Sequence, residues 1–166
     1  MFGDIETIKQ VWETLKGNSE CVGRPDWSLL SIVSGQPEIN ANTTNEFVAQ
    51  FLNLDKLEAI NFKKGCFPGQ EIIARMHYRG KATKRMVRLH ISQPVSLTSG
   101  EELVLQDSAE RSYKFTIVSI GQDIYEGSIA LAVTTLKPLE STQGDLKTAD
   151  GAIATIEPMP YDLSEE

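Results

Sequence analysis

A cysteine between two glycines, directly after two lysines, is the stretch of this sequence whose residue types point most clearly to chemistry. Its residues are Lys63-Lys64-Gly65-Cys66-Phe67-Pro68-Gly69-Gln70-Glu71. The glycines allow the backbone to turn sharply and to approach a ligand closely. A helical pattern follows from about Gln70 to Arg79, with Pro68 suited to its first turn and Glu71 favoured there by the helix dipole.

The position of Cys66 predicts an activated thiol. A thiol near a helix N-terminus and beside Lys63 and Lys64 is expected to have a lowered pKa, and so more thiolate at neutral pH. The alternative is a buried, inert cysteine in a turn that the glycines shape. Cys21 lies in a polar loop with no basic or helical context, and we interpret it as incidental.

Helices are expected to lead up to this stretch. Asp4 to Lys16 has apolar residues at helical spacing, with Asp4 as a cap at the start and Gly17 closing the end in a left-handed conformation. Residues 18–26 are predicted to form a loop, and residues 27–33 a strand or a short helix. Two further short helices are expected, one ending at Phe51 and one within residues 52–62.

Strands are expected after the signature helix. Residues 86–91 alternate strictly between outward and inward positions, and the ranges 103–105, 113–120, 127–136 and 151–156 are further strand candidates with glycines between them. Short strands at this spacing predict a small β-barrel or sandwich. The acidic, proline-containing tail from Glu157 is expected to be loosely held.

The charge of the chain is negative overall but locally positive. The net charge is −7, which argues against a generic nucleic-acid binder and against direct DNA binding. Residues 63–88 nevertheless hold eight of the sixteen Lys and Arg residues against one acid, Glu71. This predicts a local patch that faces an anion. Arg75 and Arg79, four residues apart, share one helical face, and arginine binds carboxylate or phosphate in bidentate fashion.

Several other chemistries are disfavoured by the spacing of the residues. The two histidines and two cysteines show no metal-ligand spacing, so no metal site is expected. A Cys-His hydrolase, with Cys66 as nucleophile and His77 or His90 as base, lacks an orienting third group. No secretory leader and no apolar run of membrane-spanning length is present, and two cysteines make no disulfide framework, so a cytoplasmic protein with free thiols and no membrane contact is expected.

The signature stretch resembles a known family. Lys64 to Glu71 is similar to the K-G-C-[YF]-x-G-Q-E signature of the YgfZ family, which are folate-binding proteins related in fold to the T-protein (aminomethyltransferase) of the glycine cleavage system. Upstream, Asn53-Leu54-Asp55-Lys56-Leu57 and Ile60-Asn61-Phe62 resemble the family's lead-in. Downstream, Ala74 to Gly80 and Lys84-Arg85 resemble its "AR-x-HYRG…KR" run. Ser31 departs from the family, because many relatives carry Arg there, and a substrate contact made by that Arg is in doubt here.

The resemblance implies an α+β chain that matches the carboxy-terminal half of such proteins. Residues 1–84 would end a T-protein-like folate-binding domain, residues 85–160 would form a small antiparallel β-barrel, and residues 161–166 an acidic tail. The chain would then be a fragment or a shortened homologue, and the remaining half would contribute much of the folate cavity. A homodimer that completes the fold is an alternative.

The resemblance also implies a function. Tetrahydrofolate, or a one-carbon derivative, would be the cofactor, and the protein would support iron–sulfur cluster assembly or repair and thereby tRNA modification, with iron–sulfur enzymes as partners. Cys66 would be the reactive thiol, and the residues expected to line the folate site are Lys64, Gly65, Gly69, Gln70, Glu71, Arg75, Arg79 and Arg85. Two alternatives stay open, a folate-dependent aminomethyltransferase and a scaffold that acts only as a protein-interaction module.

Overall fold

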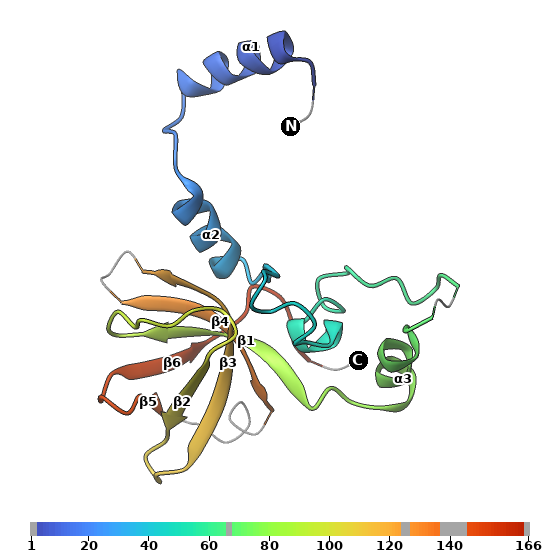
Figure 1. Cartoon of the computed structure of the whole chain (residues 1–166), viewed down its shortest axis with the longest axis vertical. Coiled ribbons are helices and arrows are strands. Elements are labelled where there is room, and N and C mark those ends of the chain that lie inside the picture. The colour runs from blue at the N-terminus through green and yellow to red at the C-terminus, as the bar shows by residue number, and fades with distance from the viewer. Residues whose placement is uncertain (1–2, 66–67, 124–126, 137–145, 165–166) are drawn as a thin grey trace.

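The computed structural model describes residues 3–65, 68–123, 127–136 and 146–164. Its elements follow one another as the helices α1 (Ile5–Lys16) and α2 (Arg24–Val33), the 3-10 turn η1 (Ala49–Leu52), the helix α3 (Glu71–Arg79) and six strands. The strands are β1 (Lys84–Ile91), β2 (Glu102–Gln106), β3 (Ser112–Gln122), β4 (Ser128–Thr135), β5 (Leu146–Lys147) and β6 (Ile153–Glu157). The helices therefore precede the strands, and this segregation of helices from strands is typical of an α+β chain (Figure 1).

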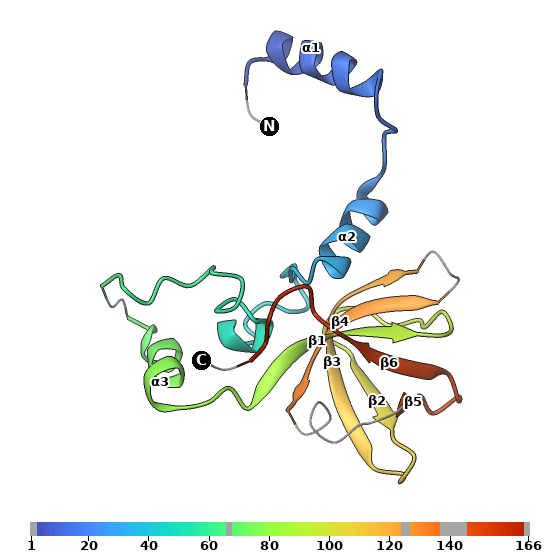
Figure 2. The ribbon, with the colours of Figure 1, turned by 180° about the vertical axis from the view of Figure 1, so that it is seen from behind.

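The six strands close into an antiparallel barrel. Their order around the barrel is β1-β4-β3-β2-β5-β6, and β6 pairs back onto β1. The pairing of β1 with β4 is the longest regular ladder, from Lys84 opposite Thr135 to Ile91 opposite Ser128. Closure leaves no unpaired sheet edge, which is how a small antiparallel sheet avoids pairing with other chains. Seen from behind, α3 and the barrel lie on opposite sides of the start of β1, whereas α2 lies next to the barrel (Figure 2).

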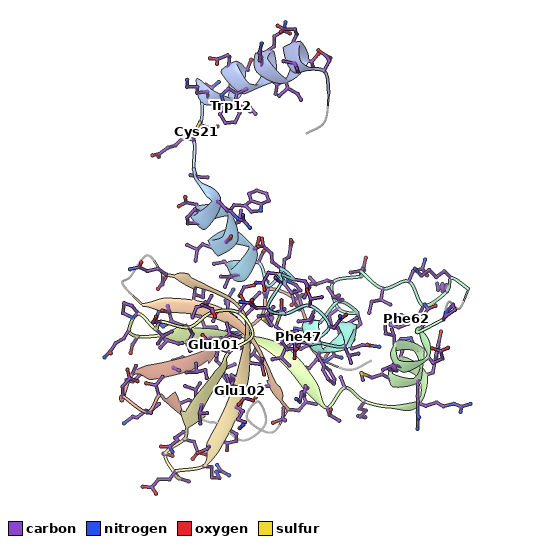
Figure 3. All side chains as sticks on the ribbon, viewed as in Figure 1. Trp12, Cys21, Phe47, Phe62, Glu101 and Glu102 are labelled. Carbon is purple, nitrogen blue, oxygen red and sulfur yellow. The ribbon has the colours of Figure 1, made fainter. Side chains whose placement is uncertain are left out.

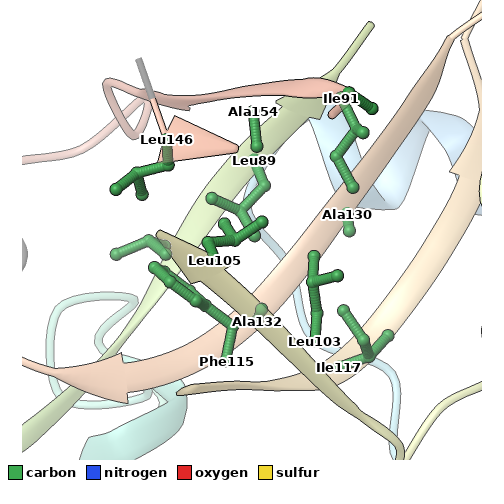
Figure 4. Close-up of a cluster of buried hydrophobic side chains, with 12 residues drawn as sticks. Leu89, Ile91, Leu103, Leu105, Phe115, Ile117, Ala130, Ala132, Leu146 and Ala154 are labelled. Atoms are coloured by element: carbon green, nitrogen blue, oxygen red, sulfur yellow. The ribbon is translucent and has the colours of Figure 1, made fainter. Parts of the chain in front are cut away.

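Alternation along β1 assigns its two faces to two hydrophobic clusters. Val87, Leu89 and Ile91 point into the barrel, where they pack with side chains from the other strands, including Leu105 and Phe115 (Figure 4). The intervening Met86 points outward and is equally buried, because α2 and η1 cover that side of the barrel. The prediction of a small β-barrel is thereby confirmed, and the alternation predicted for residues 86–91 is present.

The first helix is present where the sequence predicts it. Asp4 caps α1 by accepting hydrogen bonds from the backbone N–H and the hydroxyl of Thr7. Gly17 ends the helix with φ −68°, so the predicted left-handed closure is wrong. No residue of α1 is buried, and α1 stands clear of the barrel in both views (Figures 1 and 2).

The second helix begins earlier than the predicted loop allows. The loop prediction for residues 18–26 is wrong at its end, because α2 starts at Arg24. Pro25 suits the first turn of a helix, and Asp26 accepts a hydrogen bond from the backbone N–H of Gly23. Residues 27–33 therefore continue a helix, which settles the open choice between strand and helix.

The predicted second helical segment within residues 52–62 does not form. The chain makes the short turn η1 and then a series of turns, because Asn53 and Glu58 adopt left-handed conformations with φ 58° and 55°. A residue in that conformation cannot continue an α-helix. The short helix predicted to end at Phe51 corresponds to η1, which extends one residue further to Leu52.

The segment after β6 is attached to the body of the protein, so the predicted loose tail is wrong up to the last described residue. Met159 packs against the cluster around Met86. The Tyr161 hydroxyl donates to the backbone oxygen of Gly35 at 2.9 Å. Gly35 is required at that point, because its φ is +69° and a Cβ there would lie 2.8 Å from both Met159 and Tyr161.

Among the described residues, none of the helices combines the length and the apolar character that crossing a membrane would require.

Candidate functional site

Two stacked aromatic rings connect the residue before the signature segment, residues 63–71, with the helix after it. Phe62 precedes the segment and His77 lies in α3, and their rings are parallel within 7° at a centroid separation of 3.7 Å. Tyr78 adds an edge-on contact with His77 and donates its hydroxyl to the backbone oxygen of Phe62 at 3.4 Å. These aromatic contacts hold the residue that precedes the signature segment against α3, on the side of the molecule away from the barrel (Figure 3).

The helix that follows the signature confirms part of the prediction. α3 begins at Glu71 and ends at Arg79, and Glu71 lies in its first turn as expected. Pro68 precedes the helix and does not lie in its first turn, so that prediction is wrong. Of the apolar residues of α3, Ile72 has 63% of its surface exposed, whereas Ile73 and Met76 are half-buried. α3 has no buried residue at all.

The two signature glycines differ in backbone conformation. Gly69 has φ +88°, which favours glycine, whereas Gly65 has no such conformation. A Cβ at either position would meet no atom within 4 Å among the described residues, so no close backbone approach is seen there. Cys66 and Phe67 lie outside the described residues, and the predictions made for Cys66 are untested. Lys64 and Gln70 each take part in an interaction within the protein.

Arg75 and Arg79 lie on α3 one helical turn apart, and both side chains are exposed. No ion pair involves either arginine within the part of the chain that the structure describes. Two exposed guanidinium groups at this spacing are positioned to bind a dianion or two neighbouring carboxylates. Their role in folate binding stays a prediction.

Arg85, the third predicted arginine, is in a different environment. It is buried, and its Nη1 donates to both carboxylate oxygens of Asp55, at 2.7 and 2.9 Å, and to the backbone oxygen of Gln50 at 2.8 Å. The Asp55 carboxylate is 15% exposed, so both charges are largely removed from water. The arrangement fixes η1 and the turn after it against the start of the barrel.

Gln50 connects this buried pair to the signature helix. Its side-chain nitrogen donates to the backbone oxygen of Ile73 in α3 at 2.7 Å, and its own backbone oxygen accepts from Arg85. Gln50 is 2% exposed, and within the described part of the chain its Oε1 has no hydrogen-bond partner. Sequence reasoning missed Gln50, because the contact joins residues 23 positions apart and no motif marks it.

Asn53 is a second buried polar residue in this region that sequence reasoning assigned no role. Its side-chain nitrogen donates to the backbone oxygen of Met86 at 2.8 Å and to the Tyr161 hydroxyl at 3.3 Å. Burial raises the pKa of Tyr161 above the usual tyrosine value, while the hydrogen bond from Asn53 and the nearby charge of Arg85 oppose that rise. Asn53 adopts a left-handed conformation, which asparagine tolerates better than most residues. The asparagine itself is therefore the feature of the sequence that could have indicated this turn.

Two grooves on the surface lie away from the predicted site residues. One, of about 410 Å³, runs between the start of α2 and the end of β3, and the second, of about 230 Å³, adjoins it at Ile120, Gly121 and Gln122. None of the predicted site residues lines either groove. Within the described ranges no cluster of three metal-ligating side chains is found. His90, considered as a base, pairs with Asp123 at 3.0 Å on the barrel, whereas His77 stacks on Phe62.

Comparison with known proteins gives one consistent set of relatives. No family model matches the chain. The tRNA-modifying protein YgfZ of Escherichia coli strain SMS-3-5 is 32% identical over 163 residues, and the proteins of the same name from Enterobacter sp. strain 638 and Klebsiella pneumoniae strain 342 are 29% and 28% identical over 162 residues. Each match covers 98% of this chain and 49% of the relative.

The matches therefore extend from the exposed helix α1 through the signature segment to the last strand of the barrel. The chain spans about half the length of these relatives, and the half that it matches is the carboxy-terminal one. The expected resemblance, which was based on the signature and its flanks, is confirmed over nearly the whole chain. This chain is thus similar, over nearly its whole length, to the carboxy-terminal half of the YgfZ proteins.

Proposed function

We propose that the protein has a YgfZ-type role in tRNA modification. The observation that carries this proposal is the similarity, over 98% of this chain and 49% of each relative, to proteins that are named for that activity. It includes the barrel and the helices as well as the signature. A match limited to the barrel would support only a shared fold, because one fold hosts many functions. Here the similarity also covers the one segment whose residue types point to chemistry.

Within this role, Cys66 is the reactive thiol. Two features of the described residues support it. Lys63 and Lys64 are exposed immediately before the cysteine, and α3 begins five residues after it, with its first N–H groups unpaired by the helix itself. A cationic surrounding and a helix N-terminus both stabilise a thiolate. The maintenance of iron–sulfur enzymes, which the family resemblance implies, would use this thiol.

Tetrahydrofolate, or a one-carbon derivative of it, is the proposed cofactor, and the described residues fit one end of it. Arg75 and Arg79 present two exposed guanidinium groups to its glutamate carboxylates. The Arg85 guanidinium is held by Asp55 and Gln50, so its contribution is to fix the base of α3 through Gln50. Folate would supply one-carbon or redox chemistry when bound.

The role in tRNA modification is tested in a chimaera of the Escherichia coli relative, in which residues 1–166 replace the half that they match. The chimaera is expressed in a strain that lacks its own YgfZ protein, and modified nucleosides in total tRNA are measured by mass spectrometry. We expect the chimaera to restore the nucleosides that the intact relative restores. A chimaera that accumulates to the same level and restores none of them would contradict the proposal.

Folate binding is tested separately, by titrating the same chimaera with tetrahydrofolate under reducing conditions. Loss of both guanidinium groups in Arg75→Gln/Arg79→Gln should weaken binding about tenfold or more, since each charge-assisted hydrogen bond contributes roughly 1.5–3 kcal/mol. Arg111→Gln is the matched control, because Arg111 is an exposed arginine next to β3 whose ion pair, among the described residues, is with its neighbour Asp107. Equal binding by both variants would exclude Arg75 and Arg79 from the site.

A further inference from the structure

The helix α2 is apolar on two faces, and the described part of the chain covers one of them and leaves the other exposed. Leu29 and Ile32 pack against the outside of the barrel, in the cluster that contains Val118 and Leu131. Trp27 and Leu30 lie on another face of the same helix and are 64% and 58% exposed. A surface helix of a globular protein normally has one apolar stripe, and a helix that is apolar on further faces is normally buried.

The helix α1 presents a complete apolar face that none of the described residues buries. Ile5, Ile8, Trp12 and Leu15 recur at helical spacing, and each is between 36% and 70% exposed. An isolated helix of this length is marginal in water, so most of the stability of such helices comes from packing of their apolar face. Figure 3 shows Trp12 on α1 clear of the barrel. Both tryptophans of the chain, Trp12 and Trp27, are therefore more than half exposed.

We propose that this α1–α2 apolar surface, made of Ile5, Ile8, Trp12, Leu15, Trp27 and Leu30, binds a polypeptide equivalent to the amino-terminal half of the YgfZ relatives. The barrel has its own closed core and needs no further layer. The two helices lack the layer that would bury them. The relatives contain about as much chain again as the part matched here, which is the source of such a layer.

A second copy of this chain is the competing occupant. The helices α1 and α2 each contain as many basic as acidic residues, so charge does not favour pairing of two copies. The additional length of the relatives supplies the covering polypeptide instead. Formation of this complex rests on the exposed helices and does not depend on the reactive thiol. It can therefore be observed or excluded whether or not the proposed function holds.

The test is co-expression of the tagged 166-residue chain with the untagged amino-terminal half of the Escherichia coli relative, and in parallel with that of the Enterobacter relative. Mass and stoichiometry are measured by light scattering, and amide hydrogen exchange is followed in α1 and α2. We expect a one-to-one complex in which exchange in both helices slows about tenfold or more relative to the chain alone.

Leu30→Lys and Val104→Lys form a matched pair of variants. Leu30 is on the proposed surface, whereas Val104 is an exposed apolar residue of β2, 43% exposed. Leu30→Lys should weaken the complex about tenfold or more, as expected for loss of one buried leucine, and Val104→Lys should leave it within about twofold. Leu15→Lys repeats the test on α1.

Three outcomes would overturn the proposal. One is a chain that forms dimers with protected helices and ignores both amino-terminal halves, which would make a second copy the occupant. Another is a monomeric chain whose helices exchange at the same rate with and without either half. The third is a complex that Leu30→Lys, Leu15→Lys and Val104→Lys weaken equally.

Discussion

The Phe62 ring lies parallel to the His77 ring at a centroid separation of 3.7 Å, and this contact joins the residue before the signature segment to the helix after it. His77 belongs to α3, whereas Phe62 precedes the lysines that begin the segment. The stack therefore sets the separation between the start of the segment and the helix that follows it.

Loss of this stack should expose the segment to proteolysis. We expect Phe62→Ala and His77→Ala to accelerate tryptic cleavage after Lys63 and Lys64 severalfold, because an aromatic pair contributes about 0.5–1.5 kcal/mol beyond its buried area. His77→Phe keeps a ring in place and should behave like the unmodified protein. Cleavage rates that do not differ between His77→Ala and His77→Phe would show that the stack does not order the segment.

The buried ion pair of Arg85 and Asp55 should be essential for stability. Asp55→Ala leaves the Arg85 charge buried without its counter-charge, and we expect a loss of about 3–5 kcal/mol in the free energy of unfolding. Glu102→Ala is the control, because it removes the partner of Lys114 from an exposed pair and should cost less than about 1 kcal/mol. Urea denaturation of both variants measures the difference, and similar losses would contradict the account.

Tyr161 should make stability fall at alkaline pH. Burial raises the pKa of Tyr161 above its ordinary value of 10.0, so the folded state holds the phenolic proton more tightly than the unfolded state does. Its contribution is complete below about pH 10 and is lost as the pH rises through the raised pKa. We expect the unfolding midpoint to fall less steeply above pH 10 in Tyr161→Phe than in the unmodified protein. Identical pH profiles would refute this assignment.

The two signature glycines should respond differently to alanine. Gly69→Ala forces a side chain into φ +88° and should cost about 1 kcal/mol or more, although the added Cβ meets no described atom within 4 Å. The Cβ added by Gly65→Ala meets no atom of the described residues within the same distance, and position 65 has no positive φ, so this change should be nearly neutral. Thermal unfolding of the two variants provides the comparison. A larger loss for Gly65→Ala would reverse our interpretation of the turn.

The sequence predicts the barrel well because its signals are local. Alternation in β1 and the glycines between strands are visible within a few residues, and the structure contains the strands where these patterns lie. The start of α2 is harder to predict, because packing of this helix on the barrel depends on residues far away in the sequence. The turns after η1 were missed because a helical apolar spacing is interrupted by the left-handed Asn53 and Glu58.

The candidate site shows the same division. The signature, its helix and the two exposed arginines of α3 follow from neighbouring residues. The environment of Arg85 does not, because its partner Asp55 is 30 positions away and the sequence presents Arg85 as one more member of a basic run. The link from Gln50 to Ile73 is equally invisible, since it depends on how two segments meet in space.

The most direct test of the central claim compares the two cysteines in the chimaera with the Escherichia coli relative. Cys66→Ser removes the proposed reactive thiol, whereas Cys21→Ser removes an exposed thiol outside the signature. Modified nucleosides are measured in total tRNA from a strain that lacks its own YgfZ protein. We predict that Cys21→Ser restores them as the unmodified chimaera does and that Cys66→Ser, present at the same level, does not. Full restoration by Cys66→Ser would contradict the account.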